Sequence, residues 1–171
     1  SAFATLGAYT PPRVVTLVQD AGGVPIYEAQ QPAPSAALDP RVAYQTVSIL
    51  QDVVDRGTGT AARRAGLPPG LPVAGKTGTT NDNADVWFVG FTPNLVAGVW
   101  LGFDRPQSIA RGAFGGTLAA PIWSLFAREA YRHLPVPAAW QPPPGLVPVR
   151  VHRRDGSIAP ADSSGGSYTE Y

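Results

Sequence analysis

Three extended, apolar-rich runs follow one another in the middle of the chain, and they constrain its fold more than any other feature. They span residues 71–80, 85–92 and 95–103. The last two are rich in β-branched and aromatic side chains and are joined only through Pro93 and Asn94, which is typical of an antiparallel hairpin. The sequence therefore predicts a hairpin at the centre of the fold, with another extended run directly before it.

Helical patterns lie on both sides of these runs. Asp39 and Pro40 form an N-cap followed by proline at the first helical position, and the helix is expected to end at Gly57. Its predicted apolar face consists of Val42, Val47, Ile49, Leu50, Val53 and Val54. A last helix is predicted over residues 118–133, capped by Thr117. The apolar face predicted for it consists of Ile122, Leu125, Phe126 and Ala130.

The remaining segments are predicted to be short or irregular. Residues 1–9 resemble the tail of a helix that Gly7 breaks, and 13–19 with 24–28 predict a hairpin. We expect a linker at 29–39 and loops at 58–70 and 104–116. A proline-rich extended segment at 135–148 leads to a small terminal hairpin around Asp155-Gly156, and residues 163–171 are expected to be a frayed tail.

Composition excludes some classes of function. Thirteen basic and twelve acidic residues give a net charge of +1, so there is no broad electrostatic reason to bind nucleic acid or an anionic membrane. The chain has no cysteine and only two histidines, which leaves little for a metal site, and no cofactor is expected. No apolar run reaches the length of a membrane span.

The first extended run carries the chemistry. It contains Lys76, which is the only lysine among the thirteen basic residues, inside the segment Gly75-Lys76-Thr77-Gly78-Thr79-Thr80. A glycine within a strand often marks the close approach of another backbone, and an exposed strand edge can receive a peptide as an added strand. A lysine ammonium and threonine hydroxyls suit a carboxylate at the end of that peptide. The residues therefore predict a strand that binds a peptide acid.

A second interpretation competes for the same residues. Residues 70–77 fit the phosphate-binding pattern G-x-x-x-x-G-K-[ST]. That motif must follow a buried strand and open a helix, whereas residues 61–69 cannot form a buried strand and a strand-like run follows Thr77. A nucleotide site is therefore the less favoured hypothesis.

The ordered set of motifs resembles class A penicillin-binding proteins, which make and cross-link peptidoglycan. The resemblance covers residues 1 to about 134. It includes Lys76-Thr77-Gly78-Thr79-Thr80-Asn81-Asp82, the run from Asp85 to Pro93, Val99-Trp100-Leu101-Gly102, Gly57-Thr58-Gly59 and Ala120-Pro121-Ile122-Trp123. It implies an α+β fold with an antiparallel sheet flanked by helices, as in penicillin-binding transpeptidases and β-lactamases, and incomplete in this chain. Residues 1–134 would form the C-terminal portion of the transpeptidase domain, and 135–171 a proline-rich linker and small β tail.

The resemblance also implies a function. A serine-type transpeptidase would bind a peptidoglycan stem peptide ending in D-Ala-D-Ala, release D-alanine and cross-link the acyl group, and β-lactams would trap the same serine. It would work at the extracytoplasmic face of the bacterial inner membrane (the periplasm), with its membrane anchor outside this chain. Lys76 would help to place the substrate carboxylate and tune the proton relay, and the Thr77 and Thr79 hydroxyls would bind that carboxylate. The Thr79 N–H would be an oxyanion donor, Gly78 would keep the strand clear, and Trp87 would line the cleft, although tryptophans in a strand pair, such as Trp87 and Trp100, are more often core.

Two of the family's three catalytic elements are missing. With Lys76 as the only lysine and valine at position 73, there is no S-x-x-K motif, and no asparagine has a serine two residues before it. We expect that the chain alone cannot acylate. The favoured hypothesis is a dissected enzyme whose N-terminal catalytic half carries the serine on another polypeptide, because residues 1–9 resemble the inside of a family element. The alternative is a non-catalytic relative that binds peptidoglycan or a partner.

Overall fold

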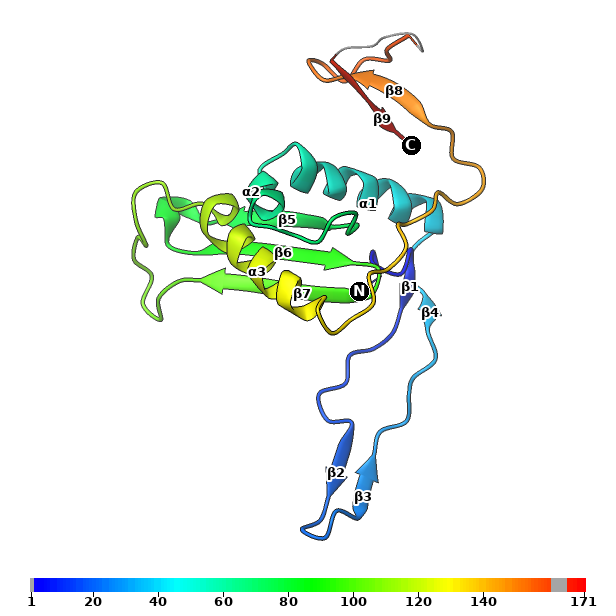
Figure 1. The fold of residues 1–171 in the computed structure, drawn as a ribbon, viewed down its shortest axis with the longest axis vertical. Coiled ribbons are helices and arrows are strands. Elements are labelled where there is room, and N and C mark those ends of the chain that lie inside the picture. Colours follow the sequence, from blue (N-terminus) through cyan, green and yellow to red (C-terminus); the bar gives the residue numbers. More distant parts are fainter. Residues whose placement is uncertain (1, 161–165) are drawn as a thin grey trace.

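The computed structural model describes residues 2–160 and 166–171. A three-stranded sheet lies at its centre, with α3 packed on one face, α1 at one end of the other face, and a long arm projecting from one end (Figure 1). The elements in chain order are β1 (Ala8–Tyr9), β2 (Leu17–Gln19), β3 (Pro25–Glu28), β4 (Ser35–Ala36), α1 (Pro40–Asp55), α2 (Thr60–Arg64), β5 (Ala74–Thr79), β6 (Val86–Thr92), β7 (Leu95–Leu101), α3 (Ala120–Ala130), β8 (Val149–His152) and β9 (Ser167–Glu170).

The central sheet confirms the predicted hairpin. Its strands are antiparallel in the order β5-β6-β7. β6 and β7 pair from Val86 opposite Leu101 to Thr92 opposite Leu95, so that Pro93 and Asn94 form the turn. β5 pairs with β6 along its whole length, and among the described residues no strand pairs with its other side. The strand that carries the lysine is therefore an edge strand.

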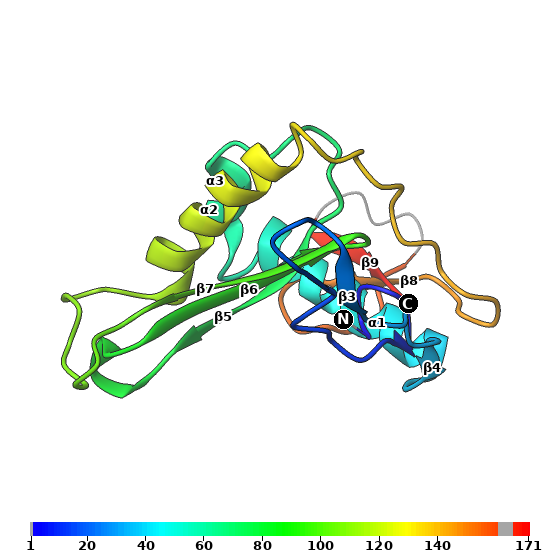
Figure 2. The ribbon, with the colours of Figure 1, turned by 90° about the horizontal axis from the view of Figure 1, so that it is seen from below.

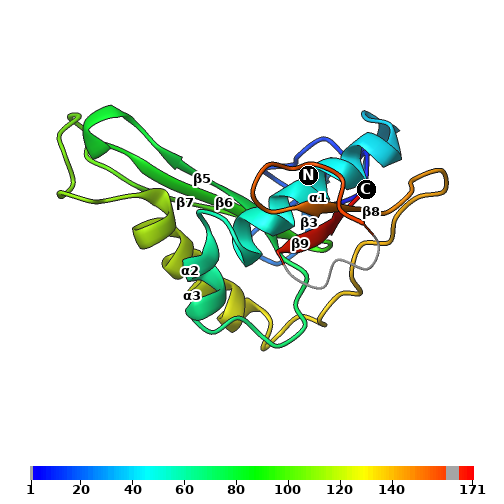
Figure 3. The same ribbon diagram turned by 90° about the horizontal axis from the view of Figure 1, so that it is seen from above.

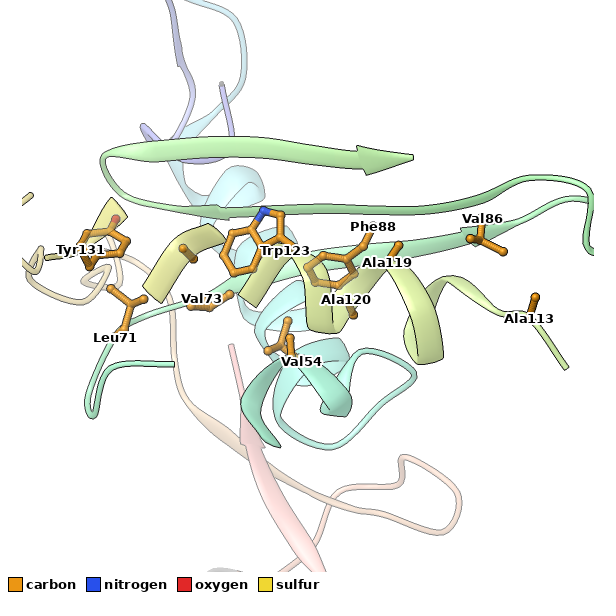
Figure 4. Packing of buried hydrophobic residues seen from close by; sticks show 12 residues of the cluster. Val54, Leu71, Val73, Val86, Phe88, Ala113, Ala119, Ala120, Trp123 and Tyr131 are labelled. Carbon is orange, nitrogen blue, oxygen red and sulfur yellow. The ribbon is translucent and has the colours of Figure 1, made fainter. Parts of the chain in front are cut away.

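One face of the sheet packs against α3 and forms the main core (Figure 4). The Trp123 ring is fully buried against Phe88, with ring centroids 5.6 Å apart, and its indole N–H donates to the Ala97 carbonyl at 3.0 Å. A Cβ at Gly90 would lie 2.5 Å from the Trp123 ring, well inside contact distance. The absence of a side chain at this position lets the indole lie directly on the sheet.

The opposite face of the sheet is covered at one end only. Ala74 and Phe91, which are paired across β5 and β6, pack against Tyr44 and Val47 of α1 and against Trp140. Farther along the strands the same face presents larger side chains that are only half buried: Trp87, Val89 and Trp100, each 43–44% exposed. Trp87 and Trp100 are therefore not core residues, contrary to the more common case in a strand pair.

Helix α1 begins as predicted and buries part of the predicted face, since Val47 and Val54 are fully buried and Leu50 packs against the core. The Asp39 carboxylate accepts the Arg41 N–H at 2.8 Å, and Pro40 is the first helical residue. The buried positions are Ala43, Tyr44, Val47 and Val54, whereas Val42 and Ile49 are more than half exposed. Ile49 faces a cavity beside the C-terminal strands, which explains its exposure.

Helix α3 packs on the sheet with a face other than the predicted one. It spans Ala120–Ala130 and follows a π-helical turn at Gly115–Ala119, so Thr117 lies inside this turn instead of capping the helix. Its buried residues include Trp123 and Ala127, while the predicted face of Ile122, Leu125 and Phe126 is exposed. Apolar side chains lie almost all round this helix, and the bulky Trp123 decides which side meets the sheet.

Several local predictions for the first 70 residues are corrected. Residues 2–7 form turns and not the tail of a helix, with Gly7 at φ +102°. The stretch 29–39 contains β4, which pairs with β1, and the stretch 58–70 contains α2. The predicted hairpin is present as β2 and β3, with shorter strands, and forms the projecting arm in Figure 1.

The C-terminal strands pack on α1 (Figure 3). β8 pairs with Ser167–Glu170, so residues 166–171 are not a frayed tail, while residues 163–165 of that prediction lie outside the described residues. The predicted turn at Asp155-Gly156 is present, but only one bridge, Val151 to Ile158, forms across it. The Gln45 amide donates to the Tyr171 carbonyl at 2.7 Å and ties the terminal strand to the helix.

Candidate active site

Lys76, Thr77, Gly78 and Thr79 are consecutive residues of β5, at the free edge of the sheet. Figure 2 shows this strand at the margin of the sheet as it runs away from α1. The nucleotide-binding hypothesis required a helix after Thr77, and it is wrong because β5 continues to Thr79. The segment therefore has the geometry of an exposed strand.

The free edge presents the peptide groups of alternate residues. The Thr80 N–H donates to the Asp85 carbonyl at 3.0 Å, so the even-numbered residues direct their N–H and C=O groups toward β6. The odd-numbered residues Thr77 and Thr79 then direct theirs away from the sheet. The Lys76 ammonium donates to the Thr77 carbonyl at 2.8 Å along this edge. Such an edge can receive an extended peptide through main-chain hydrogen bonds.

Each threonine hydroxyl at this edge already has one partner within the chain. The Thr79 hydroxyl accepts the Gly115 N–H at 3.1 Å. The Thr77 and Thr58 hydroxyl oxygens lie 2.8 Å apart, and either can donate. Thr58 follows the end of α1 and Gly115 precedes α3, so three separate segments meet at the two threonines.

Sequence reasoning did not assign a role to Thr58 or to the Gly115-Gly116 pair. A Cβ at Gly115 would lie 2.2 Å from the Trp87 carbonyl oxygen, and one at Gly116 would lie 2.0 Å from the Thr58 carbonyl oxygen. Only glycine allows the backbone to approach this closely. The signal that could have found these residues is the pair of glycine-rich segments, 57–59 and 115–116, which flank the lysine strand in the sequence.

Trp87 lies next to the strand but not beside the threonine hydroxyls. It is paired directly with Gly78, and a Cβ at Gly78 would meet the Trp87 Cβ at 3.2 Å. Because side chains alternate along a strand, Trp87 shares a face with Lys76 and Gly78, whereas Thr77 and Thr79 point to the other face. The indole of the neighbouring Trp100 donates to Asp85 at 2.9 Å, so an aromatic pair extends from the Lys76 side of the strand.

The charge of Lys76 is open to an anionic ligand. Its side chain is exposed, and within residues 2–160 and 166–171 no acidic side chain forms an ion pair with it. Two threonine hydroxyls lie one and three residues farther along the strand. One ammonium, two hydroxyls and two free peptide N–H groups together form a set of donors suited to a carboxylate.

A cavity of about 860 Å³ lies between α1 and the β8–β9 pair, away from the β5 edge. Among the described residues, no group of three or more His, Asp or Glu side chains is gathered as a metal site requires. None of the helices in the part of the chain that the structure describes is long and apolar enough to cross a membrane.

Comparison with known proteins agrees with this fold. The family model of the penicillin binding protein transpeptidase domain matches residues 1–125, and the chain belongs to this family. Among curated relatives, penicillin-binding protein 1A of Pseudomonas aeruginosa is 42% identical over 141 residues, which cover 82% of this chain and 16% of the relative. The chain therefore spans about one sixth of the length of that relative.

Two solved structures extend the comparison. Penicillin-binding protein 1A from Haemophilus influenzae superposes with a TM-score of 0.79 at 21% identity, covering 99% of this chain and 30% of that chain. Penicillin-binding protein A from M. tuberculosis, solved as a ceftriaxone acyl-enzyme complex, gives a TM-score of 0.55 at 25% identity, covering 74% and 30%. The predicted α+β fold, with an antiparallel sheet and flanking helices, is confirmed as a partial penicillin-binding transpeptidase fold.

Proposed function

We propose that this chain supplies the substrate-binding strand of a serine-type peptidoglycan D,D-transpeptidase. The observation that carries the proposal is the free edge of β5, where Lys76, Thr77 and Thr79 present an ammonium that no described acidic side chain neutralises, two hydroxyls and two peptide N–H groups. The substrate class is a stem peptide that ends in D-Ala-D-Ala. Such a peptide joins the edge as an added strand and brings its terminal carboxylate to these donors.

Each donor has a separate role in this proposal. Thr77 and Thr79 donate their hydroxyl protons to the carboxylate, and Lys76 attracts it and tunes proton transfer near the nucleophile. The Thr79 N–H, which points away from β6, stabilises the oxyanion that forms when the carbonyl of the penultimate residue is attacked. Gly78 keeps the strand surface free of a side chain, and Trp87 lines the cleft on the Lys76 side.

The reaction needs a serine that these 171 residues do not place in an S-x-x-K motif. The serine hydroxyl loses its proton to a neighbouring base and bonds to the penultimate carbonyl carbon, and the terminal D-alanine leaves as the amine. A stem-peptide amine of a second strand then displaces the serine oxygen and completes the cross-link. β-Lactams are acyl donors to the same serine, in keeping with the ceftriaxone acyl-enzyme form in which the M. tuberculosis relative was solved.

The serine-bearing part of the enzyme is the chain's principal partner. Trp87, Val89 and Trp100 form a half-exposed apolar surface on the Lys76 face of the sheet, which suits contact with a further protein segment. That contact places the serine beside Lys76. The substrate is peptidoglycan, so we assign the site to the extracytoplasmic face of the bacterial inner membrane.

Labelling with a fluorescent penicillin tests the proposal. The complete enzyme is incubated with the reagent, digested, and the modified peptide is located by mass spectrometry. We expect the adduct on a serine outside residues 1–171, and we expect Lys76→Gln to slow acylation about a hundredfold because a charge-assisted contact is lost. Thr46→Val is the control, since the Thr46 hydroxyl bonds only its own helix at the Val42 carbonyl.

Two outcomes would overturn the proposal. An adduct on a residue within the 171 would show that this chain carries its own nucleophile. No adduct at all would favour the alternative of a non-catalytic relative that binds peptidoglycan or a partner.

A further inference from the structure

We infer that Thr58 is a positioning residue that sets the Thr77 hydroxyl as a donor to the substrate carboxylate, and that the Gly115 N–H does the same for Thr79. The inference rests on the proposed function and extends it to residues outside the lysine strand. Its basis is the meeting of three segments at β5: the residues after α1, the strand itself and the turn before α3.

When a carboxylate is bound, the Thr58–Thr77 hydrogen bond can have only one donor, the Thr58 hydroxyl. The two hydroxyl oxygens are 2.8 Å apart, and each hydroxyl has a single proton. When Thr77 donates its proton to a carboxylate, it has none left for Thr58, so Thr58 must donate to Thr77. A hydroxyl that accepts one hydrogen bond becomes a stronger donor in the next, because successive bonds polarise one another.

The Thr79 hydroxyl is prepared in the same way by a backbone group. It accepts the Gly115 N–H at 3.1 Å, and an N–H can only donate. The Thr79 proton is therefore available to a ligand. Two hydroxyls that each accept from the protein present two protons, which match the two oxygens of a carboxylate. A ligand whose carboxyl is capped as an ester carries no negative charge there, so these two donors stabilise it less.

Contacts on two sides fix the position of the Thr58 backbone, from which the hydroxyl extends. The Gly59 N–H donates to the Val53 carbonyl at 2.8 Å, which ties the residue after Thr58 to the last turns of α1. On the other side, a Cβ at Gly116 would lie 2.0 Å from the Thr58 carbonyl oxygen. Thr58 is an exposed residue, but its backbone is held between the end of α1 and the turn before α3. A backbone held on two sides is what a positioning residue needs.

The preference for a carboxylate measures the inference directly. In the complete enzyme, the second-order rate constant of acylation is measured for benzylpenicillin and for its methyl ester, whose carboxyl is capped. The ratio of the two constants is the carboxylate preference. We expect Thr58→Val, which keeps the shape and removes the hydroxyl, to lower this ratio about tenfold by slowing benzylpenicillin alone. Thr58→Ser restores the hydroxyl and should restore the ratio.

Thr60→Val is the matched control. Thr60 lies two residues farther along, and its hydroxyl is bonded to the Arg64 side chain at 3.4 Å and not to the lysine strand. Its ratio should equal that of the wild type. Equal slowing of both reagents by Thr58→Val would show a merely structural role and overturn the inference, as would an unchanged ratio. Failure of the wild-type enzyme to react with benzylpenicillin would overturn the proposed function itself.

Discussion

Replacement of Gly90 by alanine should destabilise the sheet strongly, because the new methyl group has no space. A Cβ at this position would lie 2.5 Å from one Trp123 ring atom, 2.7 Å from the Phe88 ring and 2.8 Å from a second Trp123 atom. Both rings are fully buried, so neither can swing into solvent. Overpacking a core costs about 1–3 kcal/mol, and a clash with two rigid rings belongs at the upper end, about 3 kcal/mol.

Urea unfolding followed by tryptophan fluorescence measures this cost. With a urea dependence of about 2 kcal/mol per molar, a loss of about 3 kcal/mol lowers the midpoint by about 1.5 M. The slope should stay the same if only stability changes.

Gly98→Ala is the matched control on the neighbouring strand. There the nearest atom to a new Cβ is a Val89 methyl at 3.8 Å, which is an ordinary contact. Alanine is favoured over glycine in a strand by about 0.5 kcal/mol, so the midpoint should rise slightly. If Gly90→Ala and Gly98→Ala gave equal midpoints, the packing of Trp123 directly on the sheet would be refuted.

Three further predictions follow from other parts of the structure. The buried Ser124 hydroxyl has no hydrogen-bond partner among the described residues, so Ser124→Ala should raise the free energy of unfolding by about 1 kcal/mol in the same urea assay; a destabilised variant would reveal a partner. The hydrogen bonds from the Arg41 side chain and backbone lower the pKa of Asp39 to about 2, below its ordinary 3.8. The stabilisation of the fold by the ionised Asp39 carboxylate is therefore full above pH 3.8 and is lost as the pH falls toward 2. Asp39→Asn, which still caps α1, should flatten thermal stability over this acid range, and an unchanged pH profile would contradict the assignment. Burial, with the neighbouring Asp52 carboxylate, raises the pKa of Glu170, so docking of β9 on α1 should weaken as the pH rises through that raised pKa. The protection factors of the β9 amides, which are exchange rates corrected for the intrinsic effect of pH, should fall accordingly in the wild type and stay constant in Glu170→Gln.

The sheet and the site strand were predictable because their signals are local. Two β-prone runs joined by Pro93-Asn94 can hardly form anything but a hairpin, and the lysine strand carries its candidate site residues consecutively. Alternation along an edge strand is enough to place Thr77 and Thr79 on one face and Lys76 on the other.

The helix faces were predictable from periodicity only in part: Val47 and Val54 of α1 are buried as expected, whereas the predicted face of α3 is exposed. In α3, Ile122, Leu125 and Phe126 form an apolar stripe that is as convincing as the buried one, and only the fit of Trp123 over Gly90 selects the buried side. When apolar residues surround the axis of a helix, an apolar stripe does not identify which side of the helix packs against the rest of the protein. The exposure of Ile49 in α1 has the same origin, since its neighbour is a strand more than a hundred residues later.

The supporting residues of the site depend on contacts between distant segments. Thr58 meets Thr77 across 19 residues, and Gly115 meets Thr79 across 36. A sequence pattern can mark glycine-rich segments, but it does not show that they converge on one strand. The path of the chain after α1 and before α3 was needed to join them.

A crystal structure of the complete enzyme acylated by benzylpenicillin tests the central claim most directly. The account predicts that the drug's carboxylate lies within hydrogen-bond distance of the Thr77 and Thr79 hydroxyls, beside the Lys76 ammonium and along the free edge of β5. It also predicts that Thr58 remains hydrogen-bonded to Thr77. A carboxylate bound elsewhere, with the β5 edge left in contact with solvent, would contradict the assignment of this strand as the substrate-binding element.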